Sequence, residues 1–368
     1  MRLRKAIIYA VLSICRIFLL WTNVKEDKIT FISLESDHLT GDFKLLSDSL
    51  RKENRYELNY ILVKFEKSLK GNFLYFISCI RQLFAINTSK LVILDYNNYV
   101  VSNFKRDNVK VLQLWHASGA IKKFGNDVSR DYAISGYDYV IVNCDYFVKP
   151  FASAFGVKEE NVKVTGIPKT DRLFQSHKIR KDQKWMWEHY PQIKGKKVVL
   201  YAPTFRGKLM HNLGNSTIDL DRVAQELGSD YVILYKMHPL LENVIISESQ
   251  DVICCNGMSI KRLFSVSDYL ISDYSAIIID YSAFEKPMLF YTPDLEEYRK
   301  DVGFYVDYEK EMPGPICFNE EQVIEAIKKD AFDINKIRAF KKKFFAYTDG
   351  KSVLRVHALV DDIMGGKL

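Results

Sequence analysis

The chain has 368 residues, of which 48% are hydrophobic and 27% are charged. This composition is typical of a globular protein, and it excludes an intrinsically disordered chain and a polytopic membrane protein. Lys and Arg number 53 against 46 Asp and Glu, so the formal net charge is +7, which suggests an anionic partner. At roughly 150 residues per domain, the length predicts two domains.

The first 22 residues combine basic and apolar side chains. On a helix, the polar side chains recur every three or four residues and form one stripe: Arg2, Lys5, Tyr9, Ser13 and Arg16. A helix from Ala6 to Trp21 would be about 24 Å long, which is short for a bilayer core of about 30 Å. We therefore expect residues 1–22 to form an amphipathic helix on a membrane surface. A helix packed on its own domain is the open alternative.

The six cysteines show no metal-binding pattern. None forms a CxxC pair and none stands at zinc-ligand spacing from a histidine, which argues against a structural zinc site. Cys254 and Cys255 are adjacent in an apolar run, where we expect small buried thiols. Cysteines of this kind indicate a reducing compartment.

The rest of the chain alternates strand-like and helix-like segments. In the first half the predicted strands are Lys28–Leu34, Glu57–Val63, Leu91–Leu94, Val109–Leu114 and Tyr137–Val142, with helices such as Asp42–Glu53 and Phe73–Leu83 between them. A polar, basic segment at 175–185 interrupts the pattern. A second series follows: Lys197–Tyr201, Tyr231–Tyr235, Asp251–Cys254, Tyr269–Ile271 and Met288–Tyr291. This order predicts an α/β fold with two Rossmann-like domains, 23–176 and 177–368, facing a cleft.

Polar residues that follow strands are the candidates for chemistry, because ligands of open α/β sheets bind at the carboxyl ends of the strands. His116 follows the strand Val109–Leu114, where its near-neutral pKa suits a general base. A structural histidine that caps the turn is an equally open alternative. Arg206 follows Lys197–Tyr201 and suits an anionic ligand, although an ordinary surface arginine is the more frequent outcome.

Two further strand ends point to phosphate. Lys236 and His238 follow Tyr231–Tyr235, and in an extended chain they would point the same way around a buried Met237. Ser272, Asp273 and Ser275 stand before an apolar helix, where they can cap its N-terminus or, with its N–H groups, bind phosphate. The absence of a glycine-rich nucleotide motif excludes P-loop kinases and nicotinamide dehydrogenases.

Six segments, in this order, resemble the CDP-glycerol glycerophosphotransferase family of teichoic acid synthesis: LWHASGAIKKFG, VTGIPKTDRLF, VLYAPTFRG, YKMHP, SDYLISDYSAIIIDYSAFEKPMLFYTPDLEEY and VGFYVDYEKEMPGPI. The family's fold is the glycosyltransferase B type. The length and the form of WHASGAIKKFG look more like the primase members than the long polymerases. Ala276 departs from the family, which often has a second serine there, so Ser275 or a backbone N–H must contact the phosphate instead.

The resemblance implies a transferase mechanism. His116, in the N-terminal acceptor domain, takes the proton of an acceptor hydroxyl, whose oxygen attacks the β-phosphate of CDP-glycerol and releases CMP. The C-terminal domain binds CDP-glycerol, with His238 as a second catalytic residue. The expected donor-binding residues are Lys236, Arg206, Ser272, Asp273, Ser275, Asp280 and Asp307, and Asp294 contacts a hydroxyl or caps a helix. These residues require no metal or other cofactor, and Mg²⁺ is left open.

The resemblance also implies partners and a location. The acceptor would be an undecaprenyl-pyrophosphate-linked disaccharide, and the enzyme would be peripheral at the cytoplasmic face of the membrane of a Gram-positive bacterium. The basic, aromatic segment 333–347 suits a headgroup surface, or else forms a packed amphipathic helix. A polymerase or ribitol-phosphate transferase of the same family and a non-catalytic, membrane-attached nucleotide-binding protein remain alternatives. Nucleic acid is not expected as a partner, and a homo-oligomer is left open.

Overall fold

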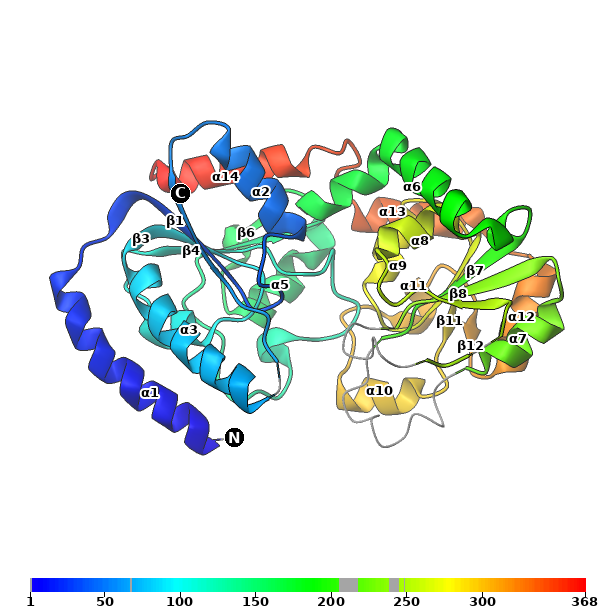
Figure 1. Cartoon of the computed structure of the whole chain (residues 1–368), viewed down its shortest axis with the longest axis horizontal. Coiled ribbons are helices and arrows are strands. Elements are labelled where there is room, and N and C mark those ends of the chain that lie inside the picture. Colours follow the sequence, from blue (N-terminus) through cyan, green and yellow to red (C-terminus); the bar gives the residue numbers. More distant parts are fainter. Residues whose placement is uncertain (1, 67, 205–217, 238–244, 248) are drawn as a thin grey trace. The chain divides into compact units, whose positions relative to one another are not determined.

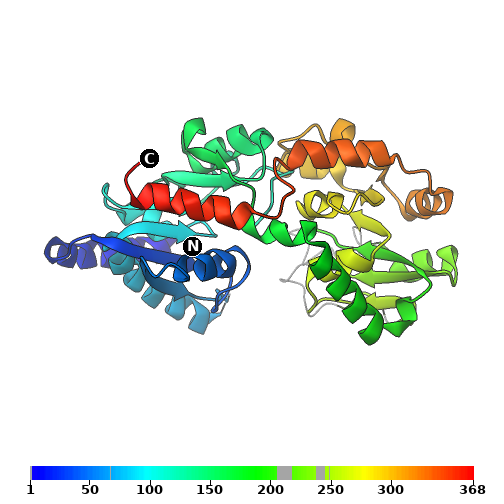
Figure 2. The same cartoon turned by 90° about the horizontal axis from the view of Figure 1, so that it is seen from above.

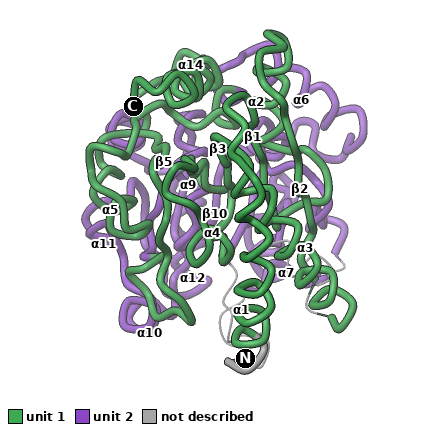
Figure 3. The backbone as a smooth tube through the Cα atoms, turned by 90° about the vertical axis from the view of Figure 1, so that its left-hand side faces the viewer, with its two compact units in different colours: residues 1–118, 124–171, 345–368 green, residues 119–123, 172–344 purple. Residues whose placement is uncertain are grey.

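The computed structural model describes the chain apart from residues 1, 67, 205–217, 238–244 and 248, and it does not describe the side chains of residues 2–4. Two compact units make up the chain (Figure 3). Unit 1 comprises Met1–Ser118, Phe124–Asp171 and Phe345–Leu368, and unit 2 comprises Gly119–Lys123 and Arg172–Phe344.

Each unit contains one six-stranded sheet in which every pair of neighbouring strands is parallel. In unit 1 the order is β2-β1-β3-β4-β5-β6, with β1 Lys25–Ser33, β2 Glu57–Leu62, β3 Ser89–Leu94, β4 Lys110–Gln113, β5 Tyr139–Val142 and β6 Val162–Val164. In unit 2 it is β12-β11-β10-β7-β8-β9, with β7 Lys197–Tyr201, β8 Tyr231–Tyr235, β9 Val252–Cys254, β10 Tyr269–Ser272, β11 Met288–Tyr291 and β12 Ile316–Cys317. The predicted α/β class is confirmed.

Helices connect the strands, as parallel sheets require. Those of unit 1 are α1 Arg2–Arg16, α2 Gly41–Arg51, α3 Leu69–Asn87, α4 Tyr99–Phe104, α5 Val148–Phe155 and α14 Ser352–Met364 (Figure 1). Those of unit 2 are α6 Ser176–His189, α7 Leu220–Leu227, α8 Ile260–Val266, α9 Ile277–Ser282, α10 Leu295–Asp301, α11 Tyr308–Glu311, α12 Glu320–Lys329 and α13 Ile334–Phe344. The short strands β6 and β12 were not predicted, because two or three residues carry no periodic pattern.

Alternating strand residues build the two cores. In unit 1, side chains such as Phe31 and Ile93 pack against α2 and α14. In unit 2, side chains such as Val199 and Ile271 pack against α7 and α12. Because both faces of each sheet are covered, the strands read as nearly continuous apolar runs rather than as alternating ones.

The C-terminal helix α14 belongs to unit 1, whereas the sequence placed all of 177–368 in the second domain. Its start is held by the buried Asp171, whose carboxylate accepts hydrogen bonds from Ser352 N at 2.8 Å and Val353 N at 3.0 Å. Figure 2 shows α14, in red, lying with the blue and cyan N-terminal segments. After the short segment Gly119–Lys123, the chain crosses into the main part of unit 2 after Asp171, close to the boundary expected at 176.

Two segments rich in charged residues lie mostly in helices of unit 2. The polar segment at 175–185 lies mostly in helix α6, which buries Met186 and Asp182. In the basic segment 333–347, Phe340, Phe344 and Phe345 are buried. Three of its cations form ion pairs, Arg338 and Lys341 with Glu285 and Lys343 with Glu311, so the packed-helix alternative holds here.

The N-terminal helix packs on its own unit by one side only. Leu12 and Leu19 are buried, and Lys5 pairs with Asp131 at 2.9 Å, so part of the predicted polar stripe faces the protein. In the described part of the chain, no helix combines the length and apolar character needed to cross a bilayer. None of the six cysteines is in a disulfide, and Cys254 is exposed rather than buried.

Candidate active site

The strand order of each sheet reverses once. In unit 1 the chain runs from β1 out to β2 and then returns to β3 on the other side of β1. In unit 2 the reversal lies between β7 and β10. Crossover connections diverge at such a point and leave the carboxyl ends of the two strands accessible, which is where open α/β sheets bind ligands.

Five polar residues gather where the strand order of unit 1 reverses, and we call them the first edge cluster. They are Ser33, Glu35, Asp95, His116 and Lys169. Ser33 Oγ donates to Asp95 Oδ2 at 2.8 Å, which joins the ends of β1 and β3. Asp95 Oδ1 is buried and has no hydrogen-bond partner among the described residues. Burial raises the pKa of Asp95 to about 7, and the nearby carboxyl groups of Glu35 and Asp42 act in the same direction.

His116 follows β4, as predicted, and its ring is exposed. Its Nδ1 lies 3.4 Å from the backbone oxygen of Asp95, and its ring stacks on Tyr96 with 6.2 Å between centroids. The preceding Trp115 has a φ of 60°, an unfavourable value for a bulky residue. Its buried ring stacks on Phe124 at 4.8 Å, so the core holds the strained turn that presents His116.

Lys169 supports the His116 turn from the segment after β6. Its ammonium donates to the backbone oxygen of His116, and its backbone N–H donates to Asp42 Oδ1 at 2.6 Å. Burial raises the pKa of Glu35, and the charge of Lys169 opposes that rise. Sequence reasoning missed Glu35 and Asp95, although both follow predicted strands in FISLE and LVILD and the strand-end rule could have found them.

A second edge cluster lies at and beside the point where the strand order of unit 2 reverses. It consists of Thr204, Lys236, Ser272 and Asp273. The buried Asp273 accepts from Thr204 N through both carboxylate oxygens, at 2.8 and 3.0 Å. Ser272 Oγ donates to the oxygen of Ala202 at 2.8 Å. Both contacts tie the end of β10 to that of β7. Thr204 Oγ1 is buried without a hydrogen-bond partner in the described part of the chain.

Lys236 follows β8, the strand next to β7. Its ammonium donates to the oxygen of Asn256 at 2.5 Å, and the Asn256 side chain accepts from Met237 N at 2.8 Å. Met237 is buried, as the alternation predicted. The structure therefore brings Lys236, Ser272 and Asp273 to one sheet edge, while Arg206 and His238 lie outside the described residues.

The other predicted donor residues have local roles in the structure. Ser275 Oγ accepts from Ile277 N at 3.4 Å, at the start of α9, which has only six residues and so a small dipole. Asp280 is buried in α9, and its Oδ1 has no described hydrogen-bond partner. The exposed Asp307 pairs with Lys310 at 2.6 Å, and this contact lowers its pKa. Asp294 Oδ1 accepts from the hydroxyl of Tyr274 at 2.9 Å.

Among the described residues, one group of side chains has the spacing of metal ligands: Glu53, His357 and Asp361. Glu53 follows α2 and precedes β2, so the group lies at the amino ends of the strands of unit 1. The first edge cluster lies at their carboxyl ends. This group is therefore separate from the candidate active site.

Residues 14–362 match the family described as CDP-glycerol:poly(glycerophosphate) glycerophosphotransferase. The chain belongs to this family. It is 34% identical over 361 residues to the teichoic acid ribitol-phosphate primase of Bacillus spizizenii, covering 93% of this chain and 92% of that protein. It is 28% identical over 379 residues to the teichoic acid glycerol-phosphate primase of Bacillus subtilis, covering 96% of each.

Among solved structures, the fold is similar to that of the wall teichoic acid polymerase TagF. The TM-score is 0.74 at 24% sequence identity, over 99% of this chain and 96% of that one. The resemblance inferred from the six motifs and the expected glycosyltransferase B type of fold are thus confirmed. The family contains phosphotransferases of teichoic acid synthesis, and both a primase and a polymerase are among the similar proteins.

Asp95→Asn tests the titratable carboxyl group of the first edge cluster. Between about pH 4 and pH 7 the folded protein holds a proton on Asp95 that the unfolded chain has lost, because the pKa is raised to about 7. The free energy of unfolding should therefore fall as the pH rises through this window, and then level off. Urea midpoints of the wild type, measured relative to Asp95→Asn, should show this fall.

The exposed Asp107 provides the control, since Asp107→Asn should follow the wild type at every pH. A difference between the wild type and Asp95→Asn that stays constant from about pH 5 to about pH 8 would contradict the raised pKa.

Proposed function

We propose that this protein transfers glycerol phosphate from CDP-glycerol to a hydroxyl of an undecaprenyl-pyrophosphate-linked disaccharide and releases CMP. This is the priming step of wall teichoic acid synthesis. The proposal depends on one observation, the position of His116. A strained turn exposes this histidine after the end of β4, and the chain belongs to a family of glycerophosphotransferases. Two relatives named as primases support a single transfer rather than polymerisation.

In the proposed reaction, His116 acts as the general base. Its Nδ1–H donates to the backbone oxygen of Asp95, so Nε2 is the basic nitrogen that takes the proton of the acceptor hydroxyl. The acceptor oxygen bonds to the β-phosphorus of CDP-glycerol while the bond from that phosphorus to the CMP oxygen breaks. Lys169 and Asp95 position the imidazole through their hydrogen bonds to His116.

The second edge cluster binds the donor in this proposal. Lys236 offers a positive charge to the pyrophosphate, and Arg206 and His238 are proposed to add to it. Ser272 and Asp273 hold the strand ends through their hydrogen bonds to backbone groups. Ser275 supplies the hydroxyl for phosphate, because Ala276 has none. Asp280 and Asp307 are proposed to contact hydroxyls of the ribose or glycerol.

A second candidate donor is CDP-ribitol, which the 34% identity to a ribitol-phosphate primase favours. The full chain should be incubated with a lipid-linked disaccharide and either CDP-glycerol or CDP-ribitol, with CMP release and product length as readouts. We expect CMP release with CDP-glycerol and addition of one unit. Release with CDP-ribitol alone would establish the second candidate, and a ladder of products would establish a polymerase. No release with either donor would refute the transferase proposal.

His116→Ala should reduce the rate of CMP release by a factor of about 100 or more, because general-base catalysis contributes about 10²–10⁴. CDP-glycerol should still bind with wild-type affinity in an equilibrium titration, because the donor-binding residues are untouched. His177→Ala, at an exposed histidine of α6, should retain full activity. A His116→Ala variant with wild-type turnover would refute the assignment of the base.

We also propose that the protein is peripheral at the cytoplasmic face of the membrane, where a lipid-linked acceptor would lie. Helices α1 and α3 pack on each other (Figure 1), and together with the 3-10 turn Ile17–Trp21 that follows α1 they expose apolar side chains. These side chains, the α1–α3 surface, are Ile7, Ile14, Ile17, Phe18, Leu20, Trp21, Leu69, Phe73, Leu74 and Ile77. Exposed cations on the same segments, Arg16, Lys70 and Arg81, suit anionic headgroups.

Replacing Trp21 by Ser should weaken binding to vesicles that contain anionic lipid, because an indole that is 75% exposed would lose its contact with the bilayer. Flotation of the full chain with such vesicles measures the bound fraction. Trp187→Ser removes an exposed Trp of unit 2 and is the matched control. Equal flotation of the two variants would contradict a role for the α1–α3 surface.

A further inference from the structure

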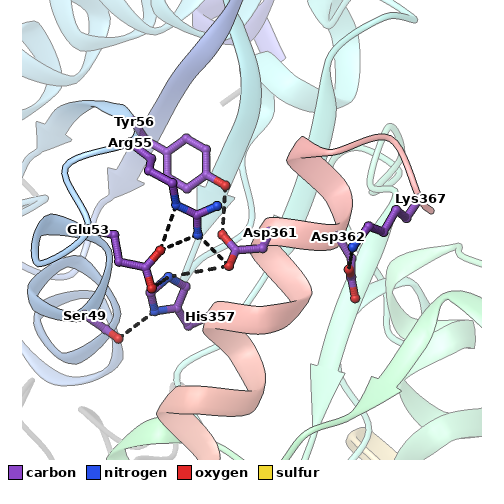
Figure 4. Close-up of polar contacts among 8 residues, drawn as sticks. All are labelled: Ser49, Glu53, Arg55, Tyr56, His357, Asp361, Asp362 and Lys367. Atoms are coloured by element: carbon purple, nitrogen blue, oxygen red, sulfur yellow. Dashed lines mark hydrogen bonds and ion pairs between the residues drawn. The ribbon is translucent and has the colours of Figure 1, made fainter.

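Three side chains converge where the end of α2 meets α14 in unit 1 (Figure 4). Glu53 follows α2, and His357 and Asp361 lie one turn apart on α14. His357 Nε2 lies 3.5 Å from Glu53 Oε1 and 3.8 Å from Asp361 Oδ2. One ligand atom from each of the three side chains lies within 4.8 Å of the other two.

His357 is the unusual member of this group. It is only 7% exposed, and its Nε2 is buried without a hydrogen-bond partner in the described part of the chain. The separations from the two carboxylates are too long for hydrogen bonds. Nδ1 is hydrogen-bonded to Ser49 Oγ at 2.8 Å. With the proton on Nδ1, the Nε2 lone pair points at two negative oxygens, an arrangement that calls for a cation between them.

The spacing fits a small metal ion. Around a tetrahedral Zn²⁺ with bonds of about 2.0–2.1 Å, the ligand atoms are about 3.4 Å apart, close to the 3.5 and 3.8 Å found here. We propose that Glu53, His357 and Asp361 bind one divalent transition-metal ion, for which Zn²⁺ is the best match, with water as the fourth ligand. Mg²⁺ and Ca²⁺ fit less well, since they prefer all-oxygen sites of higher coordination number.

Outer hydrogen bonds orient the proposed ligands, as is usual at metal sites. Ser49 fixes the ring of His357, and the hydroxyl of Tyr56 donates to Asp361 Oδ1 at 2.8 Å. Arg55 donates to Glu53 Oε2 at 2.7 Å and to Asp361 Oδ2 at 2.7 Å. It thus leaves Glu53 Oε1 to the ion but competes with the ion for Asp361 Oδ2. Arg55 should therefore weaken metal binding, and its removal should raise the affinity for the metal. A network of ion pairs that binds no metal would not give this result.

A metal ion here would be structural. It would join α14, near the C-terminus of the chain, to the end of α2, and both helices cover the same face of the sheet. Because the two segments are far apart in the sequence, the unfolded chain cannot present the three ligands together, so binding should stabilise unit 1. The cysteine pattern argued against a zinc site, but these ligands are carboxylates and an imidazole. The inference does not depend on the proposed transferase activity.

The full-length protein, freed of metal with a chelator, should be titrated with Zn²⁺ against a chromophoric competitor. We expect one ion per chain, a rise in melting temperature, and no displacement by excess Mg²⁺. His357→Gln and Asp361→Asn should each lower the affinity by more than about ten-fold. His38→Gln, which removes the exposed histidine beside Asp37, is the control and should bind as the wild type does.

Arg55→Gln should raise the Zn²⁺ affinity about ten-fold, because it removes a positive charge a few ångströms from the ion in a largely aqueous environment. A gain in affinity cannot result from misfolding, so this variant keeps the test decisive if His357→Gln does not fold. The proposal is overturned if no stoichiometric binding is found, if His357→Gln binds as tightly as His38→Gln, or if Arg55→Gln binds no more tightly than the wild type.

Discussion

The reversal of strand order in each sheet is the constraint on which the rest of the structure depends. It leaves two strand ends side by side without a covering connection, and polar side chains have to bridge them. In unit 2 the bridge is complete, because Asp273 accepts from the backbone of Thr204 and Ser272 donates to Ala202. In unit 1 it is incomplete, since among the described residues only one carboxylate oxygen of Asp95 has a hydrogen-bond partner, Ser33. Hydrogen bonds thus hold the sheet edge of unit 2, whereas the edge of unit 1 carries Asp95, whose pKa is raised to about 7 by burial.

The same geometry explains why unit 1 needs the C-terminal end of the chain. The segment after β6 carries both Lys169, which supports the His116 turn, and Asp171, which caps α14. Helix α14 then lies beside α2 and covers the same face of the sheet. The acceptor domain expected at 23–176 is therefore incomplete without residues 345–368. A truncation near residue 176 would expose this apolar face as well as remove a domain.

Apart from the short β6 and β12, the strands of both sheets and their parallel arrangement follow from the sequence, because β-branched runs between helical lengths have few other solutions. His116, Lys236, Ser272 and Asp273 could be found for the same reason, since each lies at the end of a strand or shortly after it. The assignment of α14 could not be predicted, because an amphipathic helix does not indicate which sheet it covers. The grouping of Glu53 with His357 could not be predicted either, since only the tertiary fold brings them together. For α13 the sequence left two alternatives open, because basic residues beside aromatics occur both in packed helices and in membrane-binding ones.

Aromatic residues make up 13% of the chain, and the structure shows two roles for them. Around the second edge cluster, Tyr274 stacks on Tyr298 at 3.9 Å, and the buried hydroxyl of Tyr308 donates to the backbone oxygen of Asp273 at 2.9 Å. Rings of this kind fill a core and also supply a hydrogen bond to a strand end, which Leu or Ile cannot do. Phe18, Trp21 and Phe73 are exposed instead, where their rings offer a large apolar area at little cost in side-chain entropy. Aromatic residues therefore serve both requirements of the proposed reaction, since they stiffen the edge that would bind the donor and provide the surface that would meet the membrane.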